Sequence, residues 1–140
     1  MKYLISIMFF TLYACNNKEP KPIKLNIDQC AFCKMQISDG KFGAELITDK
    51  GKVFKFDDIS CMIAYAYEHK TNVNAFFVND FTKDNFLINV NDAHFLINGS
   101  ISSPMRGNIA AFDNETALKK SNFELKAKQI SWAEILSHFK

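Results

Sequence analysis

The sequence lacks the patterns that would place it in several common classes of protein. It has no apolar run near the ~20 residues that a membrane-spanning helix needs, because the longest, residues 3–13, has about 11. Its charges almost balance, with 17 lysines and arginines against 15 carboxylate residues. No basic stretch is interleaved with aromatic residues. Nucleic acid is therefore not an expected partner.

Paired metal ligands and catalytic groupings are also scarce. The chain has one C-x-x-C pair, Cys30 and Cys33, but no second such pair and no H-x-x-x-H. A structural zinc site needs four nitrogen or sulfur ligands, so zinc is not favoured. Asp57 and Asp58 are adjacent carboxylates, but no nucleophile accompanies them at a recognisable spacing. We therefore predict that the protein is not an enzyme.

What the chain does have begins with an export signal. Lys2 precedes the apolar run, and residues 12–15 read Leu-Tyr-Ala-Cys, which resembles a lipobox. We predict that residues 1–14 are a lipoprotein signal peptide and that Cys15 becomes the acylated (palmitate-bearing) N-terminus. A plain secretory signal with an incidental cysteine is the alternative. The protein is then expected to be lipid-anchored to a cell membrane, with its domain outside the cytoplasm on the periplasmic side.

The rest of the chain reads as a tether and one domain. Residues 15–24 are polar and contain proline, as flexible tethers are. Residues 25–140 are long enough for one hydrophobic core, supplied largely by the 12 phenylalanines that lie in this range. Apolar alternation, turn residues and helix-capping residues define the elements. The expected strands are 43–48, 52–56, 75–78, 85–90, 93–97 and 108–112, and the expected helices are 57–70, 113–120 and 131–139.

Two parts of this domain resemble each other. Phe56-Asp57-Asp58 enters the first helix after a strand, as Phe112-Asp113-Asn114 enters the second. An internal duplication would explain this, and so would the same helix-capping chemistry used twice. We predict a small single α+β domain of two strand–strand–helix halves, with an antiparallel sheet and a C-terminal helix.

The number of cysteines suggests that at least one of them has a chemical role. If Cys15 carries lipid, three thiols remain, those of Cys30, Cys33 and Cys61, and three cannot all pair within one chain. A free thiol outside the cytoplasm is liable to oxidation. A bound metal ion would protect it.

Four interpretations compete for the C-x-x-C pair. A thioredoxin-like redox motif would open a helix within a βαβ pattern, whereas here a linker precedes the pair and a hairpin follows. A zinc knuckle and a simple disulfide are two others. We favour soft-metal binding, because Met35 follows Cys33 by two residues and thiolate with thioether sulfur selects Cu(I).

A second notable methionine, Met105, lies in the loop of residues 100–107. No helical or strand periodicity there requires a large apolar side chain, so it is either a ligand or a loop-packing residue. Cys61 fits a core residue or a disulfide partner better than a metal ligand, which stays the alternative. His94, near Asp92, could complete a copper sphere. Asp57 and Asp58 are interpreted as helix-start residues, since carboxylates are too hard to prefer Cu(I).

In this order, the motifs resemble those of the NosL family of copper-binding lipoproteins, which support nitrous oxide reductase maturation in denitrification. They are the lipobox, Cys-x-x-Cys-x-Met, Phe-Asp-Asp followed by Ile-Ser-Cys-Met, Ser-Pro-Met-Arg-Gly and Ala-Ala-Phe. The resemblance covers residues 28–112. One departure is Lys34, where the family motif often has glycine.

The resemblance implies a small α+β fold with two related halves and one Cu(I) ion bound by sulfur. Cys33, Met35 and Met105 match the ligands of the family, and Cys30 matches a further motif cysteine, either a ligand or a spare thiol. The implied function is a Cu(I) chaperone that delivers its ion to nitrous oxide reductase or its copper-site assembly complex. The alternatives are a thiol–disulfide oxidoreductase using Cys30 and Cys33, and a copper-scavenging lipoprotein without a reductase client.

Overall fold

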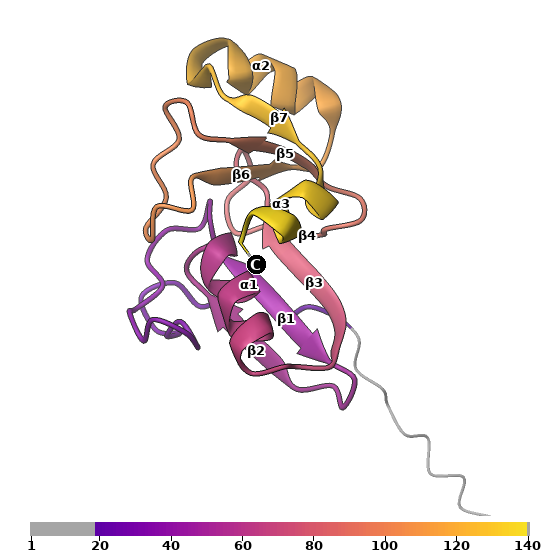
Figure 1. The fold of residues 1–140 in the computed structure, drawn as a ribbon. Helices are drawn as coiled ribbons and strands as arrows, with labels where there is room; N and C mark the ends of the chain where they lie inside the picture. The colour runs from indigo at the N-terminus through magenta and orange to yellow at the C-terminus, as the bar shows by residue number, and fades with distance from the viewer. Residues whose placement is uncertain (1–18, 140) are drawn as a thin grey trace, which may run out of the picture.

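The computed structural model of the chain describes residues 19–139 (Figure 1). The predicted signal peptide and Cys15 lie outside these residues. Within the segment 15–24, predicted as a tether, the chain already contacts the domain: Lys21 N donates to a carboxylate oxygen of Glu45 at 2.8 Å, and Ile23 is buried.

The first half is a four-stranded antiparallel sheet covered by one helix. Strands β1 (Ala44–Thr48) and β2 (Val53–Phe56) form the predicted hairpin, with Gly51 in the left-handed conformation at its turn. Helix α1 (Ile59–Glu68) follows, and β3 (Val73–Asn79) then pairs with the other edge of β1. The short β4 (Leu87–Asn89) completes the order β2-β1-β3-β4.

The second half repeats this path with a smaller sheet. Strands β5 (His94–Ile97) and β6 (Ile109–Phe112) pair antiparallel, and α2 (Glu115–Leu125) follows. Strand β7 (Lys128–Ile130) then pairs with the free edge of β5, which gives the order β6-β5-β7. The predicted α+β class and its two halves are confirmed, but each half is strand–strand–helix–strand and the strands form two sheets.

Several predicted boundaries need correction. Strand β7 was not expected, because Lys-Gln-Ile has no apolar alternation and its pairing with β5 supplies the stability. Helix α2 runs to Leu125 rather than residue 120 and ends where Lys126 adopts a left-handed conformation (φ 50°). The strand expected at 85–90 is limited to β4, since Asn85 has a positive φ of 48°.

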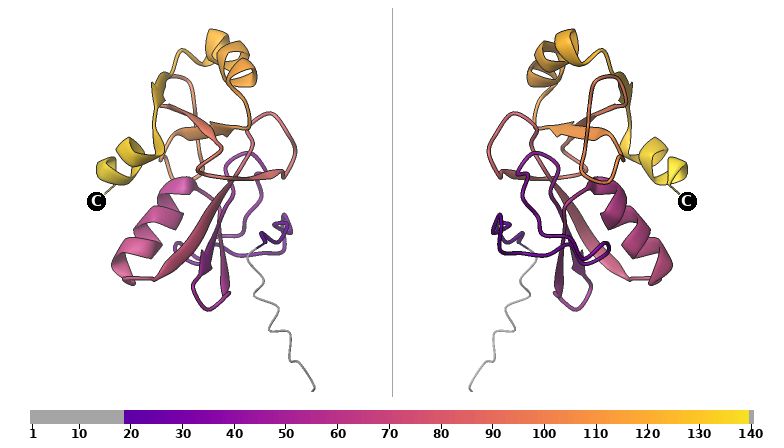
Figure 2. Two further views of the ribbon diagram at one scale, coloured as in Figure 1. Left: turned by 90° about the vertical axis from the view of Figure 1, so that its right-hand side faces the viewer. Right: turned by 90° about the vertical axis from the view of Figure 1, so that its left-hand side faces the viewer.

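The two halves lie one above the other, with the last helix at their junction (Figure 1). Helix α3 (Trp132–His138) begins at the predicted capping box of Ser131 and Glu134. Its Ile135 is buried in the same core as Ile63 of α1. The chain therefore returns to the first half, while α2 stays at the opposite end of the molecule from the N-terminal segment (Figure 2).

Candidate metal centre

Three thiols and one carboxylate meet at the N-terminal end of α1. Cys30, Cys33, Asp57 and Cys61 each offer one ligand atom, and these four atoms all lie within 4.8 Å of one another. Cys33 is partly exposed, whereas the other three residues are buried. All three cysteines are free. Simple disulfide pairing of Cys30 with Cys33 is therefore not what the structure shows.

The first two thiols come from a tight turn in the N-terminal segment. The N–H of Cys30 donates to the carbonyl of Met35 at 2.8 Å, and the N–H of Lys34 donates to the carbonyl of Cys30 at 3.1 Å. Lys34 has φ 65°, a left-handed conformation that glycine adopts at least cost. The glycine usual at this place in the family motif thus has a conformational reason. The N–H of Ala31 donates to the carbonyl of Lys55, which fixes the turn to β2.

The other two residues come from the start of α1. Asp58 is the N-cap, and its carboxylate accepts the N–H of Ser60 at 2.9 Å. Asp57 does not cap the helix, which corrects the interpretation of both carboxylates as helix-start residues. Its two oxygens accept the Cys33 thiol at 3.4 and 3.5 Å. Cys61 follows in the first turn of the helix, with its side chain buried beside Cys30.

The thiols differ in acidity although they are neighbours. A hydrogen bond from Cys61 lowers the pKa of Cys30 to about 6, against the opposing effect of burial. Burial, together with the hydrogen bond to Cys30 and the negative charges on Cys30 and Asp57, raises the pKa of Cys33 to about 11. The hydrogen bond to Cys30, with burial, also raises the pKa of Cys61. Among the three thiols, the one most readily deprotonated is thus a buried one, Cys30.

The predicted thioether ligands lie outside this buried cluster. Met35 and Met105 are 57% and 40% exposed. The loop of Met105 is nevertheless fixed beside the cluster, because Asp58 accepts the N–H of Met105 at 3.0 Å and the hydroxyl of Ser103 at 2.5 Å. A side chain on Gly107 would collide with Asp58 and Ser60, which shows how closely this loop approaches α1. Both methionine-bearing loops are thus bonded to residues of the cluster or their direct neighbours.

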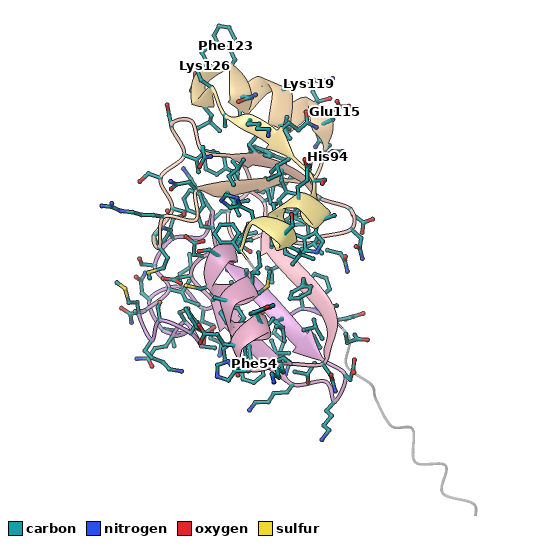
Figure 3. All side chains as sticks on the ribbon, in the orientation of Figure 1. Phe54, His94, Glu115, Lys119, Phe123 and Lys126 are labelled. Atoms are coloured by element: carbon teal, nitrogen blue, oxygen red, sulfur yellow. The ribbon has the colours of Figure 1, made fainter. Side chains whose placement is uncertain are left out.

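His94 does not belong to this site. It is the first residue of β5, opposite Phe112, in the second half of the molecule. Figure 3 shows it beside Glu115, at the start of α2. A role for His94 in completing the sphere of sulfur ligands is therefore not supported.

The sequence favours other roles for both Cys61 and Asp57, a core or disulfide cysteine and a helix-start carboxylate. Cys61 lies 31 positions after Cys30 in the sequence, and no periodicity relates the two. Their position at the start of the helix that follows β2 is the signal that could have identified them. Side chains at the N-terminal end of a helix contact the segment that packs against that end. The fold and the cluster together define a small α+β protein with a buried, cysteine-rich site of the metal-binding type.

Comparison with known proteins agrees with this class. Residues 22–138 match the model of the NosL family, and the chain belongs to that family. Its fold is similar to that of the crystal structure of the copper chaperone NosL from Shewanella denitrificans, with a TM-score of 0.72 and 20% sequence identity. The match covers 84% of this chain and 95% of that chain. No curated protein matches the sequence.

Proposed function

We propose that this chain is a Cu(I) chaperone, anchored by a lipid on Cys15 to the periplasmic side of a cell membrane, and not an enzyme. The observation that carries the proposal is the partly exposed Cys33 thiol, which borders a cluster of free sulfur donors in a chain of the NosL family. Soft sulfur donors select Cu(I) over hard cations. The similarity to a solved copper chaperone supports the same cargo.

Cys33 supplies the anionic donor of the proposed site, and Met35 and Met105 supply neutral thioethers, with Cys30 adjacent. Cys33 is the thiol of the cluster with access to solvent, and both methionines are exposed. A partner that offers one further ligand can therefore reach the ion and remove it by stepwise exchange. A fully buried ion would have no such route.

The lipid anchor is supported by the sequence of residues 12–15. Among residues 19–139, no helix is long and apolar enough to cross a membrane. The client, nitrous oxide reductase or its copper-site assembly complex, is supported by membership of the NosL family. Transfer of Cu(I) to that reductase in vitro separates delivery from scavenging, which would bind copper and not release it.

A thiol–disulfide oxidoreductase is the rival, and the lowered pKa of Cys30 is the observation in its favour. Redox C-x-x-C motifs require the low-pKa thiol to be accessible to the substrate disulfide. Here the low-pKa thiol is 1% exposed, and burial raises the pKa of the more accessible Cys33. This distribution is the reverse of what disulfide exchange needs.

An anaerobic Cu(I) titration against a chromogenic chelator tests the proposal. We expect about one equivalent of Cu(I) in the native protein, loss of at least tenfold in affinity on Cys33→Ser, and a smaller weakening on Met105→Leu. Met62→Leu is the matched control, because Met62 is a buried core methionine and this exchange conserves volume. Unchanged affinity in the first two variants, together with insulin-reductase activity, would establish the rival instead.

A further inference from the structure

Cys61 is a thiol for which the ligand set proposed above has no use. It comes from a third chain segment, α1, and is 2% exposed. Its sulfur lies within 4.8 Å of the sulfurs of Cys30 and Cys33. A core position needs only an apolar side chain of the right volume. An oxidisable thiol placed against two others, outside a reducing compartment, calls for another explanation.

The surroundings of Cys61 suit a bound cation with anionic ligands. Three sulfurs within 4.8 Å of one another can all reach one soft ion placed between them. Cys61 also lies in the first turn of α1, where the positive end of the helix dipole stabilises negative charge on a thiolate. The remaining neighbour, Asp57, offers oxygen, a hard donor that Cu(I) does not prefer.

We propose that Cys61 is a copper ligand, and that Cys30, Cys33 and Cys61 form an inner, thiol-only Cu(I) position. This inference rests on the proposed function and adds a second position to the same site. The outer position consists of Cys33 with Met35 and Met105. Cys33 is common to both, because it is the partly exposed residue between the buried pair and the exposed thioethers.

The shared ligand gives the two positions a simple relation. Cu(I) enters at the outer position, exchanges a thioether for a buried thiol, and keeps its bond to Cys33 throughout. In the inner position the ion is shielded from solvent and oxidant. For transfer to a partner, the ion returns to the outer position with Met35 and Met105. The inner position therefore retains the ion, and the outer position releases it.

The first test compares Cys61→Ala with the Met62→Leu control by competition with the chelator. We expect Cys61→Ala to lower Cu(I) affinity at least tenfold and Met62→Leu to change it less than twofold. X-ray absorption of the loaded proteins adds a structural readout: the number of sulfur neighbours of copper should fall in Cys61→Ala and stay constant in the control.

The second test does not depend on the folding of a core variant. Met35→Leu/Met105→Leu alters two exposed side chains and leaves the inner thiols intact. The inner position requires this double variant to retain one equivalent of Cu(I), with copper bound to cysteine sulfur. Adding Cys61→Ala should then reduce its affinity at least tenfold further.

The outcomes separate the inference from the proposed function. Native affinity in Cys61→Ala, together with no copper in the double methionine variant, would overturn the inner position and leave the chaperone intact. Absence of Cu(I) binding in the native protein would overturn both. Binding of Zn(II) in preference to Cu(I), lost on Asp57→Asn, would reassign the four donors as a zinc site and also overturn the inference.

Discussion

The three cysteines show how far environment can separate residues of one type. A hydrogen bond with Cys61 lowers the pKa of Cys30, and the same hydrogen bond, with burial, raises that of Cys61. Burial raises the pKa of Cys33, and the carboxylate of Asp57 adds to this effect. Cu(I) binds thiolate, so it must displace a proton from any cysteine that is protonated in the metal-free protein. The thiol with the lowest pKa, and so the most thiolate character, is that of Cys30, and burial shields it from oxidants.

Glu45 is a second buried ionisable residue, on β1. One carboxylate oxygen accepts the Lys21 N–H, whereas the other has no hydrogen-bond partner among the described residues, and Lys55 Nζ is 4.0 Å from it. Burial raises the pKa of Glu45 to about 7. A raised pKa means that the folded state takes up a proton which the unfolded state releases near pH 4.5.

This gives a prediction of pH dependence. The contribution of Glu45 to stability is fully present below about pH 4.5 and is lost as the pH rises through about 7. We expect the native protein to lose roughly 3 kcal/mol relative to Glu45→Gln between pH 4.5 and pH 8, since the amide keeps the hydrogen bond to Lys21 and does not titrate. Urea unfolding at several pH values measures this difference. A constant difference across the range would show that Glu45 titrates normally.

At the scale of elements, the N-terminal ends of α1 and α2 have similar sequences but different roles. Asp58 and Asn114 are both N-caps with extended backbone conformations. Cys61 and Ala117 each lie three positions after the N-cap. Met62 and Leu118 each lie four positions after it, and both are buried. The second half thus keeps the buried apolar position of the first but has alanine in place of the thiol, so the cluster of three cysteines belongs to the first half.

The two caps allow a matched experiment. Asp58 accepts hydrogen bonds from the N–H and hydroxyl of Ser60, the hydroxyl of Ser103 and the N–H of Met105. We expect Asp58→Ala to cost about 3–5 kcal/mol, because it leaves buried donors unsatisfied, and to weaken Cu(I) binding by releasing the Met105 loop. Asn114→Ala should cost about 1 kcal/mol and leave copper affinity unchanged. Urea unfolding and chelator competition measure both.

Asp58→Asn is a milder variant that distinguishes a loss of copper affinity from unfolding of the protein. It retains one acceptor oxygen, so its stability and copper affinity should fall between those of the native protein and Asp58→Ala. Equal copper affinity in Asp58→Ala and Asn114→Ala, with both folded, would show that the position of the Met105 loop does not affect the metal site.

For the whole molecule, Asp80 is the residue that joins the halves. It follows β3, is completely buried, and accepts the N–H of Asp113 at 2.7 Å from the second half. Its other oxygen accepts hydrogen bonds from Thr82 and from the N–H of Lys83. The next residue, Phe81, donates its N–H to the carbonyl of Ala111 at 2.8 Å. One short segment thus attaches to both sheets.

We expect Asp80→Asn to destabilise the protein by about 2–3 kcal/mol, because an amide nitrogen then faces a backbone donor. Since the halves share this connection and the packing of α3, unfolding should stay a single transition by near- and far-ultraviolet circular dichroism. Lys83→Ala is the control: it removes an exposed ion pair with Asp113 across the same junction and should leave the stability almost unchanged. Two separate transitions in the native protein would contradict this account.

The sequence by itself determined the local features, because these depend on neighbours along the chain. The hairpin at Gly51, the N-cap of α1 and the capping box at Ser131 follow from turn and capping chemistry, and the repeated Phe-Asp-Asp/Asn entry indicated the two related halves. The motifs around Cys33 and Met105 also indicated the family. Strand β7 has no such local signal, so the sequence could not show it.

Only the tertiary structure decided which side chains share a site. In the sequence, Asp57 and Cys61 resemble a helix-start carboxylate and a core thiol. They join the cluster with Cys30 and Cys33 because α1 begins where the turn of these two cysteines packs against β2. That contact depends on the pairing of segments far apart in the chain and on the burial of their apolar faces. No spacing in the sequence encodes it, since a distance across a folded core is set by packing and not by residue number.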